Sequence, residues 1–148
     1  MEYIQSDTND GAELAEIRAA AMQPSLEALG RFDESRVRNR FLDTFKPLET
    51  FKIIKNGELL GFYSVKKRDD HHYLDHLYIK PEHQNKKAGE AVVKRVIAEA
   101  KAENLPVRLG ALKESRSNHF YIRNGFRKTH QDEFDVYYEY QAHKQRAY

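Results

Sequence analysis

The residues that could do chemistry in this chain gather around one polar loop, Gln84–Gly89. The loop follows a β-rich run that ends at Ile79, and it leads directly into a helical pattern that begins at Gly89. A strand end, a short loop and a helix start bring unpaired backbone N–H groups and the positive end of a helix dipole together. Lys86 and Lys87 add positive charge. The pattern predicts a phosphate-binding loop, and a surface loop with solvated lysines is the equal alternative.

The elements that must position this loop follow from the hydrophobic pattern. Apolar residues at helical spacing predict a first helix over Asn9–Met22, and Pro24 should interrupt the chain after it. Asp33 is suited to cap a second helix, which Pro47 stops. Asn56–Gly57 lies between two β-rich runs and predicts a hairpin, because both residues tolerate the positive φ of a type I′ turn.

The clearest helix is Gly89–Glu103, whose apolar residues recur at i, i+3, i+4 and i+7 on one face. The other expected elements are strands at Glu2–Ser6, Tyr73–Ile79, Val107–Leu112, Phe126–Lys128 and Asp135–Tyr140 and a short helix at Ser117–Asn124. The resulting order, β-α-α-β-β-β-α-β-α-β-β, predicts an α/β (α+β) fold with a mixed, mostly antiparallel sheet flanked by helices. The 148 residues show no linker, and we expect one domain over residues 1–148.

Composition excludes several classes of function. The 25 Lys and Arg against 23 Asp and Glu leave a formal charge of only +2, which argues against a nucleic-acid binder. The chain has no cysteine, so it has no Cys-liganded zinc site and holds no acyl group on a protein thiol. His72 and His76 share a strand face but lie about 13 Å apart, too far for one metal ion. We therefore expect no metal.

The location of the protein is predicted from two further patterns. No apolar run approaches the roughly 18 residues of a membrane span. The start of the chain also lacks the basic and then apolar pattern of an export signal. We expect a cytoplasmic protein without a membrane partner.

Two motifs together carry a resemblance to a known family. The loop Gln84–Gly89 is a Q-x-x-G-x-G-like element that looks like the acyl-CoA pyrophosphate loop of the GNAT N-acetyltransferases. The segment Phe120–Phe126 is similar to the F-Y-x-x-x-G-F that closes the family's late helix. The expected strand Val107–Leu112 lies between them and the element order matches the family's fold, so the resemblance covers nearly the whole chain. Lys87 occupies the place of the family's first loop glycine, where a lysine fits if its φ stays negative.

The resemblance implies that the protein binds acetyl-CoA and transfers its acetyl group to a primary amine of a small molecule or peptide, by direct attack in a ternary complex. We expect a monomer or a homodimer. The residues to which the resemblance assigns cofactor binding are Leu77, Ile79, Gln84, Asn85, Lys86, Lys87, Ala88, Gly89 and Asn118. The backbone N–H of Ile79 would hold the thioester carbonyl. The family often has an asparagine seven residues before the motif tyrosine, where this chain has Glu114, and Asn118 is the alternative.

The resemblance also implies two proton transfers. Tyr121 carries the motif hydroxyl and is the candidate general acid for the departing thiolate, or else an aromatic packing residue. Asp75 is the candidate base, because it alternates with Leu77 and Ile79 on the strand face that should line the acyl slot. A strand-end carboxylate in a salt bridge is an equal alternative for Asp75. His76 and water alone are the rival bases.

The alternative function is a non-catalytic acyl-CoA-binding or regulatory module on the same fold. Tyr121 discriminates between the two, because a binding module needs no leaving-group acid. The closing hairpin of this fold usually borders the acceptor site, and its acidic residues would either form a rim that attracts a cationic amine or belong to an ordinary charged hairpin. These residues are Asp132, Glu133, Asp135 and Glu139.

Overall fold

The computed structural model describes residues 1–141 of the chain. The strands are β1 (Glu2–Gln5), β2 (Thr50–Lys55), β3 (Glu58–Lys67), β4 (His72–Ile79), β5 (Val107–Leu112), β6 (Arg127–Gln131) and β7 (Asp135–Tyr140). The helices are α1 (Gly11–Ala28), α2 (Glu34–Leu42), α3 (Ala88–Ala102) and α4 (Ser117–Arg123). This order confirms the predicted one, with short 3-10 turns added at Thr8–Asp10, Pro47–Glu49 and Pro81–His83.

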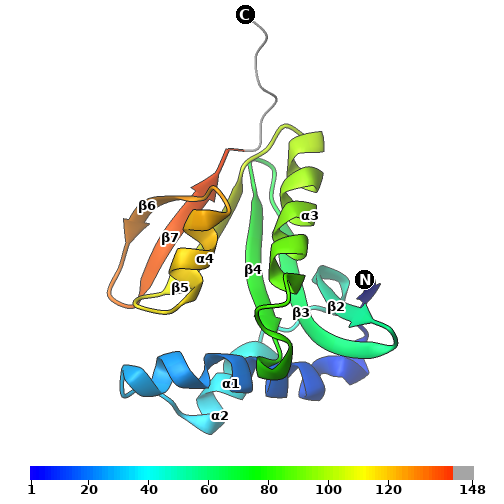
Figure 1. Cartoon of the computed structure of the whole chain (residues 1–148), viewed down its shortest axis with the longest axis vertical. Helices are drawn as coiled ribbons and strands as arrows, with labels where there is room; N and C mark the ends of the chain where they lie inside the picture. The colour runs from blue at the N-terminus through cyan, green and yellow to red at the C-terminus, as the bar shows by residue number, and fades with distance from the viewer. Residues whose placement is uncertain (142–148) are drawn as a thin grey trace, which may run out of the picture. The chain divides into compact units, whose positions relative to one another are not determined.

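The strands form one sheet in the order β1-β2-β3-β4-β5-β7-β6 (Figure 1). β4 and β5 pair parallel through His72↔Val107 and Tyr73↔Arg108, and the pairs β1–β2, β2–β3, β5–β7 and β6–β7 are antiparallel. The sheet is therefore mixed and mostly antiparallel, as predicted. The chain divides into two compact units, residues 1–64 with 76–89 and residues 65–75 with the chain from Glu90 onward. One domain over residues 1–148 stays a prediction.

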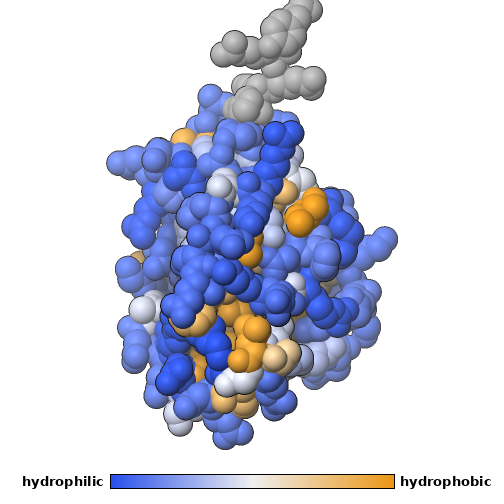
Figure 2. Space-filling model, turned by 90° about the vertical axis from the view of Figure 1, so that its left-hand side faces the viewer, coloured by the Kyte–Doolittle hydropathy of each residue, from blue (hydrophilic) through white to orange (hydrophobic). Residues whose placement is uncertain are grey.

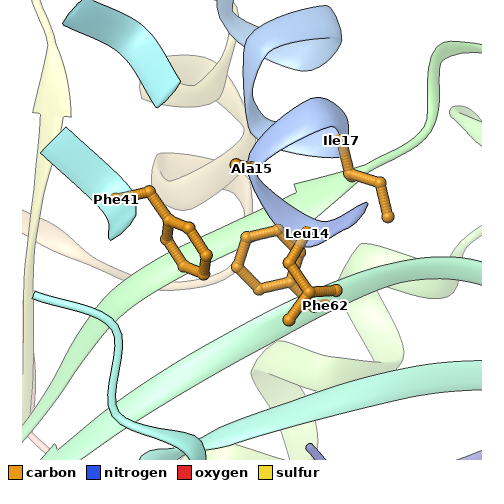
Figure 3. Packing of buried hydrophobic residues seen from close by; sticks show 5 residues of the cluster. All are labelled: Leu14, Ala15, Ile17, Phe41 and Phe62. Carbon is orange, nitrogen blue, oxygen red and sulfur yellow. The ribbon is translucent and has the colours of Figure 1, made fainter. Parts of the chain in front are cut away.

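The first unit is built around a small apolar core from α1, α2 and β3. Leu14, Ala15, Ile17, Phe41 and Phe62 are each at most 4% exposed. Figure 3 shows the rings of Phe41 and Phe62 next to each other, and their centroids are 5.1 Å apart. Burying a leucine or phenylalanine side chain contributes roughly 1.5–3 kcal/mol, so this cluster holds α1 and α2 against β3.

α1 is longer than its sequence pattern predicts. The helix continues through Pro24 for more than a turn, so the expected interruption at Pro24 was wrong. Proline removes one helical hydrogen bond, but Pro24 lies on the exposed side of α1, and the helix end beyond it is well capped. Gly30, at φ +66°, donates its N–H to the Glu27 carbonyl at 2.9 Å. The Arg31 N–H donates to the Leu26 carbonyl at 2.8 Å, which completes a Schellman motif.

The other local predictions of caps and turns are confirmed. Asp33 caps α2 by accepting a hydrogen bond from the Arg36 N–H at 2.9 Å. Asn56 and Gly57 have φ values of 52° and 78°, as a type I′ turn between β2 and β3 requires. The buried residues of the predicted α3 stripe are Val92, Val93, Val96 and Ala100.

The second unit packs α4 against β5. Val107, Leu109 and Ala111 alternate along β5 and are each at most 5% exposed, whereas β6 is an edge strand that is exposed along its whole length. The face of the molecule in Figure 2 is mostly hydrophilic with separate hydrophobic patches, in keeping with a sequence that is 32% charged. Within residues 1–141, no helix has the length and apolar character needed to cross a membrane.

Candidate active site

The predicted phosphate loop starts from a fixed strand end in the first unit. The Lys80 N–H donates to the Leu60 carbonyl at 2.8 Å, and the Gln84 side-chain amide donates to the Ile79 carbonyl at 3.1 Å. These bonds tie the start of the loop to β3 and β4. Because α3 begins at Ala88, within the last two residues of the loop, the positive end of the α3 dipole lies there, as the sequence predicts.

Two residues of this loop adopt the left-handed conformation. Asn85 has φ +66° and Lys87 has φ +64°. Lys87 therefore does not have the negative φ that would let a lysine take the place of the loop glycine. The chain enters α3 through a left-handed residue at this position. This conformation costs a non-glycine residue roughly 1–2 kcal/mol. Lys87 is thus a strained substitute for glycine that brings a positive charge to the loop.

Gly61 sets the approach of β3 to the end of β4, and the sequence analysis did not single it out. A Cβ atom at Gly61 would lie 2.1 Å from the Tyr78 carbonyl oxygen and 2.9 Å from the Ile79 Cα. Only glycine fits there, so the strand end that carries the Ile79 N–H is held at a close backbone approach. A lone glycine inside a β-rich run is the sequence signal that could have found it.

Asp75 lies in an open pocket of about 280 Å³ in the second unit. The pocket is lined by Lys66, Arg68, His71, Tyr73 and Asp75. The Asp75 carboxylate is 3.7 Å from the Lys66 Nζ, and the two side chains are 28% and 24% exposed. The salt bridge expected as the alternative for Asp75 is therefore present as a loose ion pair, and the carboxylate also borders an open space. The role of Asp75 as a base stays a prediction.

Tyr73 is a polar neighbour of Asp75 in this pocket. Burial raises the pKa of the Tyr73 hydroxyl, and the negative charges of Asp75 and Asp135 raise that pKa further. The phenol is thus kept neutral at physiological pH and is able to donate a hydrogen bond. Asp135, one of the acidic residues at the closing hairpin, is the smallest of these causes, and the role of that acidic group stays a prediction.

The two histidines of β4 have different surroundings. His76 packs against Phe41 edge to face, with ring centroids 5.3 Å apart, and its Nδ1 lies 3.5 Å from the Tyr78 hydroxyl. His72 is 1% exposed, and its Nε2 lies 2.5 Å from the Glu103 carboxylate, which links the start of β4 to the residue after α3. Among residues 1–141, no group of three or more His, Cys, Asp or Glu residues is placed to hold a metal ion.

Tyr121 lies in the core of the second unit near the end of α4. The residue is 7% exposed, and its ring centroid is 6.5 Å from that of Tyr138. Gly125 lies two residues after the end of α4, takes φ +92° and donates its N–H to the Ile122 carbonyl at 3.0 Å. The glycine of the F-Y-x-x-x-G-F motif is therefore the left-handed residue that closes the helix.

Asn118 uses its side chain for bonds inside the second unit. Its Nδ2 donates to the carbonyls of Leu112 and Ser115, at 2.9 Å and 3.0 Å. Its Oδ1 accepts a hydrogen bond from the Tyr138 hydroxyl at 2.7 Å. Asn118 thus joins α4 to β5 and β7, and its contact with a cofactor stays a prediction.

Sequence and fold point to the same family. Residues 13–126 match the profile of the Acetyltransferase (GNAT) family. The chain belongs to the GNAT acetyltransferase family. The prediction of this family from the motifs at Gln84–Gly89 and Phe120–Phe126 is confirmed, although no curated protein matches the chain at a significant level of sequence similarity.

Solved GNAT structures share the fold at low sequence identity. The PaiA N-acetyltransferase from Thermoplasma acidophilum, in complex with coenzyme A, is 20% identical with a TM-score of 0.79, over 95% of this chain and 98% of that chain. A GNAT acetyltransferase from Staphylococcus aureus Mu50 is 18% identical with a TM-score of 0.73, over 93% and 96% of the two chains. The ribosomal-protein-S18-alanine N-acetyltransferase from Escherichia coli is 14% identical with a TM-score of 0.69, over 97% and 95%.

Membership in the GNAT family supports acetyl transfer as the general activity of this chain. The likeness to the solved structures confirms the predicted fold class. The individual site residues, Tyr121 and Asp75 among them, stay predictions.

Proposed function

We propose that this GNAT protein transfers the acetyl group of acetyl-CoA to a primary amine of a small molecule or peptide, by direct attack in a ternary complex. The observation that carries the proposal is the family match over residues 13–126. Acetyl-CoA supplies the activated acetyl thioester. The absence of cysteine from the sequence supports direct attack, since no protein thiol is present to hold the acetyl group.

The loop Gln84–Gly89 is the proposed site for the pyrophosphate of acetyl-CoA. Its support is physical, because the loop combines the start of α3 with the charges of Lys86 and Lys87. Leu77 and Ile79 would line the path of the acyl group, with the Ile79 backbone N–H donating to the thioester carbonyl. A carbonyl that receives this bond is more easily attacked, because the bond strengthens as negative charge develops on the oxygen.

Asp75 is the proposed base. An alkylamine has a pKa of roughly 10 and is mostly protonated at neutral pH, so the acceptor must lose a proton before it attacks. The pocket that Asp75 lines with Tyr73 supports this role, because it leaves space beside the carboxylate for an amine or a water molecule. Asp75 would accept the proton directly or through a water molecule, and His76 and water alone are the alternatives.

Tyr121 is the proposed general acid, assigned from the F-Y-x-x-x-G-F motif. A tyrosine phenol is ordinarily protonated at neutral pH and is able to donate its proton to the departing thiolate. Positioned acid catalysis is typically worth about 10²–10⁴ in rate. The burial of Tyr121 in the second unit supports a fixed orientation for the phenol.

A non-catalytic acyl-CoA-binding module on the same fold is the second candidate. One observation favours it, because the ring of Tyr121 packs against Phe126 and Tyr138 as a purely structural tyrosine would. Such a module would bind coenzyme A and release none from acetyl-CoA, whichever amine is supplied.

A panel of amines with acetyl-CoA tests the proposal, with free coenzyme A and the mass of the acetylated product as readouts. We expect coenzyme A release that depends on the acceptor. Calorimetry with coenzyme A provides the second arm, in which Gly89→Leu should weaken binding strongly because it adds bulk at the loop. Binding of coenzyme A without turnover of any amine would favour the binding module. Unchanged coenzyme A affinity in Gly89→Leu would contradict the assignment of the loop Gln84–Gly89 as the pyrophosphate site.

A further inference from the structure

Arg18 is a buried cation whose charge is not paired with a carboxylate within residues 1–141. It lies in α1 and is 9% exposed, and its guanidinium donates to the Val37 carbonyl. Its Nε is buried and has no hydrogen-bond acceptor among the residues that the structure describes. Among residues 1–141, no carboxylate forms an ion pair with Arg18. A guanidinium is always charged in proteins, and a buried charge without a partner is costly, so this arrangement needs a reason.

Two further polar groups lie on the same side of the first unit. The guanidinium carbon of Arg18 sits over the Tyr78 ring, 5.9 Å from its centroid. The Tyr78 hydroxyl lies 3.5 Å from the Nδ1 of His76. The rings of Tyr78 and His76 both pack beside Phe62, which belongs to the apolar core drawn in Figure 3. A guanidinium, a phenol and an imidazole thus lie close together beside the ring of Phe62. The proposed acetyl transfer assigns no role to Arg18 or Tyr78.

We propose that Arg18, Tyr78 and His76 form a binding site for a small carboxylate. All three side chains are able to donate hydrogen bonds, and the planar guanidinium matches the two oxygens of a carboxylate. A single unpaired positive charge is balanced by a monoanion, whereas a phosphate dianion would leave excess negative charge in a partly buried place. The carboxylate is therefore the better ligand.

The carboxylate belongs to the amine acceptor, and this step rests on the proposed function. His76, one of the alternative bases, shares its face of β4 with Tyr78, whereas Asp75 belongs to the opposite face. An acceptor whose carboxylate binds at Arg18 would therefore present its amine on the His76 face of the strand, where His76 or water would accept the proton. The predicted substrate class is an amine that carries a carboxylate, such as an amino acid, rather than a polyamine.

Thermal unfolding with propionate, propionamide and sodium chloride at equal concentration tests the site without any turnover. We expect propionate to raise the melting temperature more than the neutral amide or the salt does. Arg18→Met should remove this difference. Arg38→Met is the matched control, because Arg38 is a helical arginine of the same unit that already has a carboxylate partner, Glu16, at 2.6 Å. If Arg18→Met fails to fold, Arg18→Lys replaces it, and a propionate effect at least tenfold weaker is expected because lysine lacks the planar fork.

Absence of a propionate effect in the wild type, or its survival in the Arg18 variant, would overturn the inference. Acetyl transfer to β-alanine and to 3-aminopropionamide separates this failure from failure of the proposed function. We expect Arg18→Met to raise KM for β-alanine about 10- to 100-fold and to leave KM for the amide unchanged. Transfer to both amines with KM values that do not depend on Arg18 would support the proposed acetyl transfer and contradict the carboxylate site. A propionate effect that depends on Arg18, without transfer to any amine, would support the carboxylate site and contradict the proposed acetyl transfer.

Discussion

The backbone N–H of Phe126 donates to the Tyr121 carbonyl at 3.1 Å, and the two rings pack with their centroids 5.6 Å apart. Phe126 thus holds the last turn of α4 through both its backbone and its side chain. Gly125 makes this return possible, because it adopts the positive φ that a Schellman helix end needs. In physical terms, the F-Y-x-x-x-G-F motif is a helix end that fixes the orientation of the proposed general acid.

Gly125→Ala should therefore lower both stability and turnover. The left-handed φ costs alanine about 1 kcal/mol. The added Cβ would also lie 2.9 Å from the Tyr140 ring, which has to shift. We expect a total loss of about 2–3 kcal/mol in urea unfolding. Gly57→Ala is the matched control, because Gly57 has φ +78° with nothing within 4 Å of an added Cβ. Equal losses in the two variants would contradict the packing role of Gly125.

Lys87→Gly should separate the charge of Lys87 from its strain. Glycine relieves the left-handed conformation, so stability should not fall. The affinity for coenzyme A should drop about twofold to fivefold, the range expected for one exposed charge pair worth up to about 1 kcal/mol. Asn85→Gly is the control, since Asn85 has nearly the same φ and no charge. Calorimetry measures both, and an unchanged affinity in Lys87→Gly would show that its ammonium points away from the phosphates.

Asp75→Asn should lower turnover by about 10²-fold and shift the acidic limb of the pH profile, because the amide accepts no proton. Asp70→Asn is the control, since Asp70 is a nearby exposed carboxylate that already bonds the His71 Nδ1 at 2.7 Å. Initial rates across the pH range measure the effect. Wild-type rates at every pH in Asp75→Asn would show that water alone removes the proton.

Asp132 and Tyr137 form a pair whose titration is set by one hydrogen bond. The Tyr137 hydroxyl donates to the Asp132 carboxylate at 2.7 Å. This bond lowers the pKa of the Asp132 carboxyl and raises the pKa of Tyr137 to about 12. A lowered carboxyl pKa stabilises the fold above the unfolded value of about 3.9, and a raised phenol pKa stabilises it below the unfolded value of about 10.

The difference in stability between wild type and Asp132→Asn should therefore be constant between about pH 5 and pH 9 and shrink on both sides. It is lost as the pH falls through the folded pKa of Asp132 and as it rises toward the folded pKa of Tyr137. Ultraviolet titration of the phenols should show the pKa of Tyr137 returning toward 10 in Asp132→Asn. The neighbouring Glu133→Gln should leave it in place, and the same Tyr137 pKa in both variants would contradict the assignment.

Local sequence signals predicted most of the fold, because they act over a few residues. The turn at Asn56–Gly57 and the cap at Asp33 needed no knowledge of distant parts of the chain. Pro24 was misjudged because packing and a Schellman end outweigh one lost helical hydrogen bond.

The site depends more on contacts between distant residues, which the sequence does not display. Lys66 and Asp75 meet across two strands, and Arg18 is buried against β4 although charged residues usually lie outside. The left-handed φ of Lys87 was hidden because lysine rarely adopts it. The predicted location, the oligomeric state and the expected absence of a metal stay predictions.

Turnover of Tyr121→Phe with acetyl-CoA and the best acceptor of the panel tests the central claim most directly. The substitution keeps the ring and its packing and removes only the hydroxyl. We expect kcat to fall by about 10²–10⁴ while calorimetry shows little change in acetyl-CoA affinity. Full turnover in the Phe variant would contradict the assignment of Tyr121 as the general acid and would leave it a packing residue.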